Sequence, residues 1–507
     1  MRIFLMAFQL LQNMGLRYVL FRAGYELKRR SGFLKLAFPV KILQKRWATL
    51  ADWKQLPTVF LFESREQLQA ENPLKPEIAE SLKTEINEYK KGNLLFFNSQ
   101  YYAVTDWFTN PKTDHRYSPT QHWTEINDFS PSAGDIKYVW EKSRFSFLYP
   151  LIRYDLQTGE DLAETVFQEI DSWIAANHLH CGPNWRCSQE IALRVLNWTY
   201  ALHYYKNSPA LTEARFERIV HLIYWQTRYV AKNINFSLIA VRNNHAITET
   251  LTMYLVGLFY PFFAESATWK KDGKRLFEQE IAYQIYEDGT FLQFSMNYHR
   301  VVVQLLTLGT DLAHRNNERF ADVVYDRYQK SLEFLQACQD PKTGWLPNYG
   351  NNDGAIFFKL DDSHYRDYRS QCSPPPPDGG VINSPIGGWG AGLGGYYTLR
   401  DDSSFTFLRC GAYKDRPFQA DNLHLDLWVN GENIMRDAGS YQYNTDERWI
   451  RYFAGTASHN TVMLGDFDQM QKGPQFLWYH WVKEAAGEWK MENGKWKILL
   501  MQMNAQY

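Results

Sequence analysis

The spacing of apolar residues changes once along this chain, and that change limits the folds open to it. From residue 137 to residue 339 apolar residues recur every three or four positions, which is typical of amphipathic helices. Around residues 404–409 and 423–429 the period is two, which is typical of strands. The helical stripes are Ile191, Val195, Trp198 and Leu202; Ile247, Leu251, Tyr254 and Leu258; and Val301, Leu305, Leu308 and Leu312. A helical array or toroid followed by a β domain is therefore predicted.

The length of 507 residues is too great for one ordinary hydrophobic core, so two or three domains are expected. We expect a helical and extended segment over residues 1–75 and a helical toroid over 76–370. The Pro/Gly-rich stretch 371–395 is predicted to connect the toroid to an antiparallel β domain over 396–507. The chain stops at Tyr507 directly after a strand-like segment, and we therefore expect the β domain to be truncated.

The composition excludes some partners. A formal net charge of −1 gives no basic field for nucleic acid or for an anionic membrane, so an anionic substrate would have to meet local arginines. Aromatic residues make up 16% of the chain, which suits sugar rings but equally suits a core. The five cysteines are scattered and show no zinc-ribbon spacing, so we interpret them as core or incidental residues.

The first 30 residues contain an apolar stretch interrupted by Gln9, Gln12 and Asn13. This stretch is too short and too polar for a clear transmembrane helix, and no signal-peptidase-like site follows it. We expect an amphipathic helix that lies on a membrane or on the toroid.

The predicted strand 423–429 places polar residues on one face. Its alternation predicts that the leucines and Val429 face the core while His424, Asp426 and Trp428 share the other face. An ordinary half-exposed strand would explain this pattern. A histidine two residues before an aspartate is also typical of a base with its orienting group, or of a metal shell. Farther along, Asp437 and His459 add ligand types that zinc accepts.

Polar groups also stand where the predicted helices of the toroid begin. Asn243 would serve as a helix cap, but Asn244 and His245 exceed what a cap requires. Tyr298 and His299 stand at the start of another apolar helix, where they could be core residues or site residues. Glu190 and Arg194 stand one turn apart in sequence, so an ion pair within one helix would explain them.

Six segments in order resemble the heparinase II/III group of polysaccharide lyases. They are NWRCSQEIALRVLNW (184–198), RNNHAITE (242–249), DGTFLQFSMNYHR (288–300), GWLPNYGNNDG (344–354), HLDLWVNGENIMRDAGSYQY (424–443) and RYFAGTASHNTVMLGDFDQ (451–469). The resemblance covers most of the chain. It implies an incomplete (α/α) toroid followed by an antiparallel β-sandwich, with an active site in the cleft between them.

The resemblance also assigns roles to particular residues. The asparagine of the family's Asn-His pair falls on Asn244, its tyrosine on Tyr298 and its β-domain histidine on His424. Where the family has an acid in a Pro-x-x-Gly-Asp segment, this chain has Asn351, or the acid has moved to Asp353. No cofactor is required by the reaction. Family members that bind zinc imply a structural zinc or another divalent metal at Asp426, Asp437 and His459.

The implied reaction is β-elimination from a uronic acid, in which donors must stabilise charge on the uronate carboxylate. Asn244 would donate to that carboxylate, helped by His245 if its ring is protonated. His424 would be the base and Tyr298 the acid, or Tyr298 could serve as both. The residues predicted to bind the anionic polysaccharide are Glu190, Arg194, Arg242, His299, Trp428, Arg448 and Arg451.

Several alternatives stay open at the level of sequence. A uronate C5-epimerase begins with the same proton abstraction, a hydrolase on the same toroid could use Glu190 and Asp353, and a non-catalytic glycan-binding protein needs no turnover. Heparan-type glycosaminoglycan, alginate and a bacterial exopolysaccharide would all provide the reacting groups, and the basic N-terminal helix favours the last. The family implies a periplasmic or cell-envelope location, whereas no clear cleavable signal is present and a cytoplasmic location stays open. The oligomeric state is not predicted.

Overall fold

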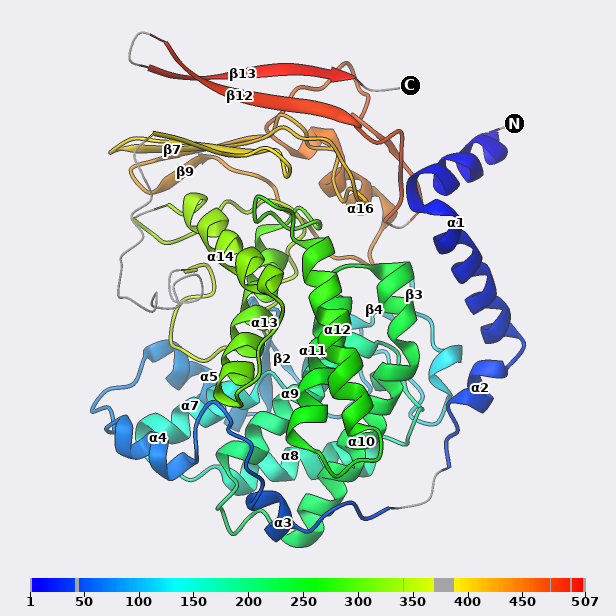
Figure 1. Ribbon diagram of the computed structural model, residues 1–507, viewed down its shortest axis with the longest axis vertical. Coiled ribbons are helices and arrows are strands. Elements are labelled where there is room, and N and C mark those ends of the chain that lie inside the picture. Colours follow the sequence, from blue (N-terminus) through cyan, green and yellow to red (C-terminus); the bar gives the residue numbers. More distant parts are fainter. Residues whose placement is uncertain are drawn as a thin grey trace.

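A computed structural model describes residues 2–41, 45–340, 342–368, 387–474, 476–492 and 495–504. Helices fill the larger part of the molecule, the strands of the C-terminal part form a separate layer above them, and the first helix runs down one side (Figure 1). This arrangement confirms the predicted order of a helical toroid followed by an antiparallel β domain. In the part of the chain described, no helix is both long enough and apolar enough to cross a membrane.

Short elements precede the toroid and pack around it. The helices are α1 (Arg2–Arg30), α2 (Phe33–Ala37), α3 (Leu50–Lys54), α4 (Arg65–Glu71), α5 (Glu80–Lys90) and the 3-10 turn η1 (Trp123–Glu125). The strands form two antiparallel hairpins, β1 (Asn93–Phe96) with β2 (Gln100–Ala103) and β3 (Phe129–Ser130) with β4 (Gly134–Asp135). Within α1 the backbone is kinked at Gly15, where φ is 79°.

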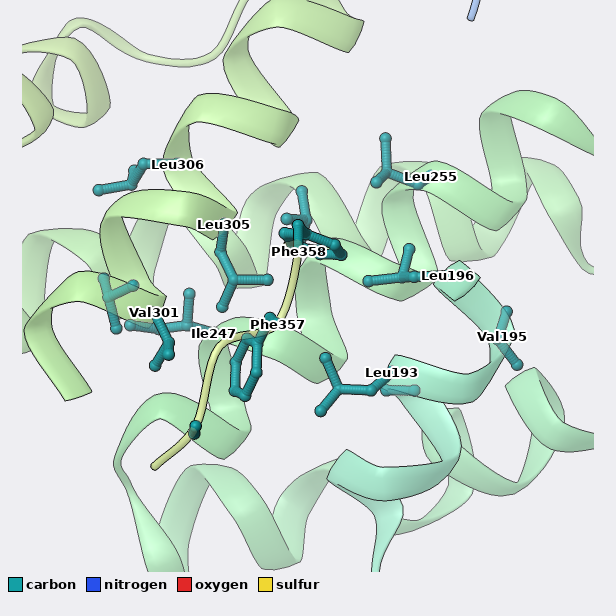
Figure 2. Packing of buried hydrophobic residues seen from close by; sticks show 14 of the residues in the cluster. Leu193, Val195, Leu196, Ile247, Leu255, Val301, Leu305, Leu306, Phe357 and Phe358 are labelled. Atoms are coloured by element: carbon teal, nitrogen blue, oxygen red, sulfur yellow. The ribbon is translucent and has the colours of Figure 1, made fainter. Parts of the chain in front are cut away.

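The toroid consists of helices whose apolar stripes face one another. They are α6 (Lys137–Ser143), α7 (Leu148–Thr158), α8 (Ala163–Ala176), the 3-10 turn η2 (Pro183–Trp185), α9 (Ser188–Tyr204), α10 (Glu213–Asn235), the π-helix η3 (Phe236–Val241), α11 (Asn244–Phe259), α12 (Ser266–Gln284), α13 (Met296–Arg315) and α14 (Asp322–Ala337). The chain after Gly354 threads between these helices, and Phe357 and Phe358 pack against the leucines of α9 and α13 (Figure 2).

Two helices begin at caps that fix the residues after them. The side chain of Asn243 accepts a hydrogen bond from the backbone N–H of His245 at 3.0 Å and begins α11. Ser295 Oγ accepts one from the backbone N–H of Tyr298 at 3.1 Å and begins α13. Caps of this kind satisfy backbone donors that the helix itself leaves free. The first turns of both helices, with the candidate site residues, are therefore held in place.

The β part contains a five-stranded antiparallel sheet in the order β5-β6-β7-β8-β9. Its elements are β5 (Gly387–Ala391), β6 (Tyr396–Arg400), β7 (Ser404–Arg409), β8 (Leu425–Val429) and β9 (Glu432–Met435), followed by α16 (Glu447–Ala454), η4 (Thr456–Ser458), β10 (Gln471–Lys472), β11 (Trp478–Tyr479), β12 (Glu484–Glu492) and β13 (Lys495–Asn504). The long hairpin β12–β13 lies over the sheet, on the side away from the helices (Figure 1). Strand β5 begins inside the predicted connection 371–395, and residues 371–386 of that connection lie outside the described residues.

The alternation predicted for residues 423–429 is present, but the predicted facing is wrong. His424, Asp426 and Trp428 are the buried face, whereas Leu425 and Leu427 are only partly buried and Val429 is exposed. The polar face is buried because Tyr349 and Phe407 cover it, with Tyr349 coming from the helical part of the chain. Alternation shows which residues share a face, but what packs on that face decides whether it is buried.

Two glycines allow α11 and α12 to approach closely. A Cβ on Gly273 would lie 2.4 Å from the backbone N of Tyr254, and one on Gly257 would lie 2.5 Å from the backbone N of Lys270. Neither backbone can retreat without separating the helices, so these positions accept no side chain.

We expect Gly273→Ala to destabilise the protein by about 1–3 kcal/mol because it overpacks this crossing. Gly24→Ala is the matched control, since Gly24 lies inside α1 with nothing within 4 Å of its added Cβ. Helix propensity alone would make each substitution stabilising by up to about 1 kcal/mol. Scanning calorimetry should therefore show a lower melting temperature only for Gly273→Ala, and equal behaviour of the two variants would contradict the close packing.

Candidate active site

A cleft of about 1150 Å³ lies where helical and β parts meet. Its walls come from α1, from residues 110–144, from the first turns of α9 and α11, from Tyr298, from residues 353–357 and from the β part at residues 416–418, 442–451 and 472–477. The residues that line the cleft include eight lysines and arginines and six aspartates and glutamates. The sequence-predicted residues that line it are Glu190, Asn244, His245, Tyr298 and Arg451, together with Asp353.

Tyr298 is held at the centre of a buried hydrogen-bond cluster. Its hydroxyl donates to Asp353 Oδ2 at 3.0 Å and lies 2.5 Å from the hydroxyl of Tyr443. Lys137 Nζ donates to the same Asp353 oxygen at 2.6 Å and lies 3.7 Å from the centroid of the Tyr443 ring. Four segments of the chain therefore meet at this phenol. Three belong to the helical part, and the one with Tyr443 belongs to the β part.

Charge in this cluster keeps the proton on the phenol. Burial and then the Asp353 carboxylate raise the pKa of Tyr298 well above its ordinary value of 10.0. Burial alone would raise the pKa of Asp353, but Lys137 and Arg144 outweigh burial, and the pKa of Asp353 is lowered. At neutral pH the cluster thus consists of a carboxylate, an ammonium and a neutral phenol that can act as a proton donor.

Asn244 and His245 occupy the first turn of α11 and line the cleft. The backbone N–H of Asn244 donates to Gln293 Oε1 at 3.1 Å. Among the described residues, the side-chain amide of Asn244 has no hydrogen-bond partner, so it can donate to a bound ligand. Burial lowers the pKa of His245 to about 4, and Lys137 and Arg144 act in the same direction. With this pKa the His245 ring is neutral at neutral pH, so the protonated form that would assist Asn244 is present only in acid.

Glu190 pairs with a different arginine from the one expected. Arg144 donates to both of its carboxylate oxygens at 2.8 Å, and this pair lies beside the cleft. Arg194 is completely buried behind it, where its guanidinium donates to Gln226 and Ser143. The predicted ion pair between Glu190 and Arg194 is therefore absent. A substrate contact by Arg194 is also contradicted, because no part of its side chain reaches the surface.

His424 does not line the cleft. It is completely buried, with Nε2 3.3 Å from Asp437 Oδ2, and His459 Nδ1 lies 2.9 Å from the same oxygen. The Nε2 atoms of both histidines are buried without a hydrogen-bond partner. One ligand atom from each of these three residues lies within 4.8 Å of the others. Two imidazoles and a carboxylate are ligands that zinc accepts, so the residues present fit such an ion.

Asp426 belongs to the surroundings of this group, contrary to the predicted ligand set. Its oxygens accept hydrogen bonds from Trp428 Nε1 at 2.5 Å and from the backbone N–H of Asp437 at 3.3 Å. His424 Nε2 is 3.9 Å from Asp426 Oδ2, farther than from Asp437. The candidate metal group is thus His424, Asp437 and His459, and the buried Trp428 orients Asp426 and has no exposed ring face for a sugar.

The other predicted binding residues are spread over the molecule. Arg242 lies in a neighbouring pocket, where its guanidinium lies over the Tyr283 ring and 3.6 Å from Glu280. His299 is buried and stacks on Phe334, and burial lowers its pKa to about 3. Arg448 is on the surface. Arg451 alone among the predicted arginines lines the cleft, paired with Glu447 at 2.7 Å.

Sequence reasoning missed Lys137, Arg144 and Tyr443. Tyr443 ends one of the segments that carry the family resemblance, so that segment contained a signal that was not used. Lys137 and Arg144 begin and follow α6, in a stretch with no recognisable motif. Only the ion pairs that they form across the fold mark them as part of the site.

Comparisons with known proteins agree with this architecture. Residues 57–355 match the family described as heparinase II/III N-terminus, and residues 385–503 match heparinase II/III-like, C-terminal. Similar proteins include a heparin-sulfate lyase of Bacteroides stercoris, 24% identical over 74% of this chain and 58% of that protein. One of Pedobacter heparinus is 23% identical over 65% of this chain and 52% of that protein. The chain thus spans little more than half the length of these relatives.

Solved structures share the fold. A heparinase III crystal structure aligns with a TM-score of 0.60 at 17% identity, covering 87% of this chain and 68% of that one. The heparan sulfate lyase of Pedobacter heparinus aligns with a TM-score of 0.50 at 20% identity, covering 88% and 68%. Since the N-terminal family match alone spans more than half of the sequence, and the C-terminal match follows it in order, this chain belongs to the heparinase II/III family.

Proposed function

We propose that this protein is a polysaccharide lyase that cleaves 4-linked, uronic-acid-containing glycans by β-elimination, leaving unsaturated uronate ends. The observation that carries the proposal is a phenol that keeps its proton, Tyr298, in the same cleft as the unpartnered amide of Asn244. Relatives named heparin-sulfate lyase support this reaction class.

The amide of Asn244 addresses the main barrier of the reaction. Removal of the C5 proton places a second negative charge beside the uronate carboxylate, and a hydrogen-bond donor fixed at that carboxylate stabilises the charge as it develops. Asn244 can supply this donor because its position is set by the cap of α11 and its backbone bond to Gln293.

Proton transfer then needs a base at C5 and an acid at the 4-oxygen. We assign the base to His245, whose neutral ring lines the cleft. As His245 takes the C5 proton, the electrons of that C–H bond form the C4–C5 double bond and the C4–O4 bond breaks. The leaving oxygen takes the proton of Tyr298. Solvent then restores that proton and accepts the C5 proton from His245. For His424 we propose a positioning role, since it is buried away from the cleft.

The charges of the cleft support an anionic substrate. Lys137, Arg144, Arg186 and Arg451 are each paired with a carboxylate. Of the other cations of the lining, Arg22, Lys112 and Arg416 lie over aromatic rings. Cations without a carboxylate partner can meet uronate or sulfate groups. The names of the relatives make heparan sulfate the first polymer to test, followed by alginate and bacterial exopolysaccharides.

A hydrolase is less well supported by the same residues. Inverting or retaining hydrolysis requires one carboxylic acid that stays protonated. Arg144 lowers the pKa of Glu190 and Lys137 lowers that of Asp353, in both cases against the effect of burial. Both groups are therefore charged at neutral pH, and neither can protonate a leaving group.

We also propose that His424, Asp437 and His459 hold a structural divalent metal, zinc being the best match to their donor atoms. Such an ion would supply a fixed cross-link between the residue that precedes β8, the segment at Asp437 and the turn at His459. It is not required for the proton transfers, which involve His245 and Tyr298.

We expect Tyr298→Phe and Asn244→Ala each to lower the elimination rate by about a hundredfold or more, because each removes a donor that acts in the transition state. The rate is measured as the ultraviolet absorbance of the new C4–C5 double bond on a panel of uronic-acid polysaccharides. Tyr89→Phe is the matched control, because its hydroxyl also donates to a carboxylate, Glu169, but outside the cleft. Solvent-deuterium incorporation without new absorbance would instead identify an epimerase, and glycan binding without either signal a binding protein.

The pH dependence should identify the base. Since the pKa of His245 is depressed, its neutral form is present above about pH 4 and is lost as the pH falls through that value. We expect kcat/KM to be constant from neutral pH down to about pH 5 and then to decline. A histidine at its ordinary value would produce the decline near pH 6.5. His245→Ala should abolish activity, whereas His424→Gln should lower activity but leave the acid limb unchanged. A limb near pH 6.5 that disappears in His424→Gln would overturn the assignment.

Metal content is a separate test. We expect purified protein to hold about one zinc per chain by elemental analysis, and a chelator that removes it to lower the melting temperature. His459→Ala should abolish metal retention, while Asp426→Asn should lower it much less. Unchanged melting after chelation would contradict a structural metal.

A further inference from the structure

The helix α1 is fixed along its inner side to both parts of the protein. Tyr25 packs on Phe236 of η3 with ring centroids 4.7 Å apart, and Arg29 donates to the backbone carbonyl of Thr124 at 3.2 Å. Nearer the N-terminus, the Gln9 side chain lies 2.8 Å from Nδ1 of His480 in the β part. Figure 1 shows α1 along one side of the molecule, with its opposite face turned away from both parts.

That opposite face is apolar and uncovered. Leu16, Leu20 and Leu27 are 60%, 62% and 70% exposed. At about 100° per residue these positions fall within an arc of roughly 40°, almost opposite the inner residues Tyr18 and Tyr25. The helix therefore carries two apolar stripes on opposite sides. One packs on the protein, and the other faces solvent in the structure.

The uncovered stripe continues beyond α1 and lies in a strongly basic segment. Phe33 and Leu36, which both lie in α2, are 55% and 81% exposed. Residues 2–41 contain eight arginines and lysines and a single acidic residue, Glu26, although the whole chain has a net charge of −1. The segment is therefore basic although the whole chain is not, even though Arg22 and Arg29 lie on the inner side and Arg30 and Lys35 are paired with Glu26 and Glu125.

We infer that the outer face of α1 and α2 docks on an anionic lipid surface. An apolar stripe flanked by cations is the pattern that inserts at the boundary of headgroups and acyl chains, with the basic residues contacting anionic headgroups. A second copy of this chain is a poorer occupant, because it would bring two strongly positive segments together. The helix lies along the surface, since no described helix is apolar enough to cross a bilayer.

Docking in this way would place the cleft beside the lipid. Tyr18, Arg22 and Tyr25 of the same helix line the cleft from its inner side. The inference does not depend on the proposed lyase chemistry, because it concerns only the outer face and can be tested without a polysaccharide.

The test is co-sedimentation of the full chain with vesicles of phosphatidylcholine alone or mixed with phosphatidylglycerol. We expect binding to the mixed vesicles only, weakened at least tenfold by Leu16→Ser/Leu20→Ser/Leu27→Ser and by raised salt. The matched control is Leu360→Ser/Leu393→Ser/Leu464→Ser, which removes three leucines that are likewise exposed but lie elsewhere. Both triple variants should keep the parental melting temperature, because all six positions are on the surface.

Absence of binding to mixed vesicles would overturn the inference. Equal loss of binding in the control variant would overturn it as well, since the effect would then be general hydrophobicity. A light-scattering mass that falls from dimer to monomer only in the α1 variant, with vesicle binding unaltered, would show that the face covers a second copy. Binding that is equal on neutral and mixed vesicles would contradict the role of the basic residues.

Discussion

A single buried carboxylate, that of Asp353, joins two helices of the toroid at the cleft. It accepts hydrogen bonds from Lys137 at the start of α6 and from Tyr298 in the first turn of α13. A charge removed from water is tolerated only where such partners surround it, so loss of either partner would leave an uncompensated charge. The chain reaches this position through Gly350 and Gly354, both at positive φ, where a Cβ would meet backbone oxygens at 2.2 Å and 1.9 Å. The tight backbone path and the buried charge therefore depend on each other.

The sequence was most informative where the residues that begin a helix lie next to the residues of the candidate site. Asn244 and Tyr298 both lie in the first turn of a buried helix, one and three positions after a capping residue whose side chain is visible as a helix-start signal. Apolar stripes on the same helices predicted the toroid because burial of a helix face leaves a period in the sequence. In these segments one pattern specified the element, its start and the residues presented to the cleft.

Long-range pairings left no comparable pattern. The spacing of Glu190 and Arg194 is that of a helical ion pair. Glu190 instead pairs with Arg144, 46 positions earlier, and Arg194 is buried and donates to Gln226. The facing of strand β8 was mistaken for a related reason. Alternation tells which residues share a face, but which face is covered depends on what packs there, and here Tyr349 from the helical part covers the polar one. Both errors arise from partners that are distant in sequence.

The positioning role proposed for His424 would act on the cleft through the segment that begins at Asp437. The carboxylate of Asp437 lies within 3.3 Å of His424 Nε2 and 2.9 Å of His459 Nδ1. Asp437 also begins the segment that leads to Ser440 and Tyr443. Ser440 exchanges hydrogen bonds with the backbone of Asn352 at 2.8 Å and 3.1 Å, next to Asp353, and Tyr443 meets the hydroxyl of Tyr298. A displacement of Asp437 would therefore be transmitted over six residues to the phenol proposed as the proton donor. A histidine can thus be essential to such a site without touching the substrate, because it fixes the segment that completes the hydrogen-bond cluster around the acid.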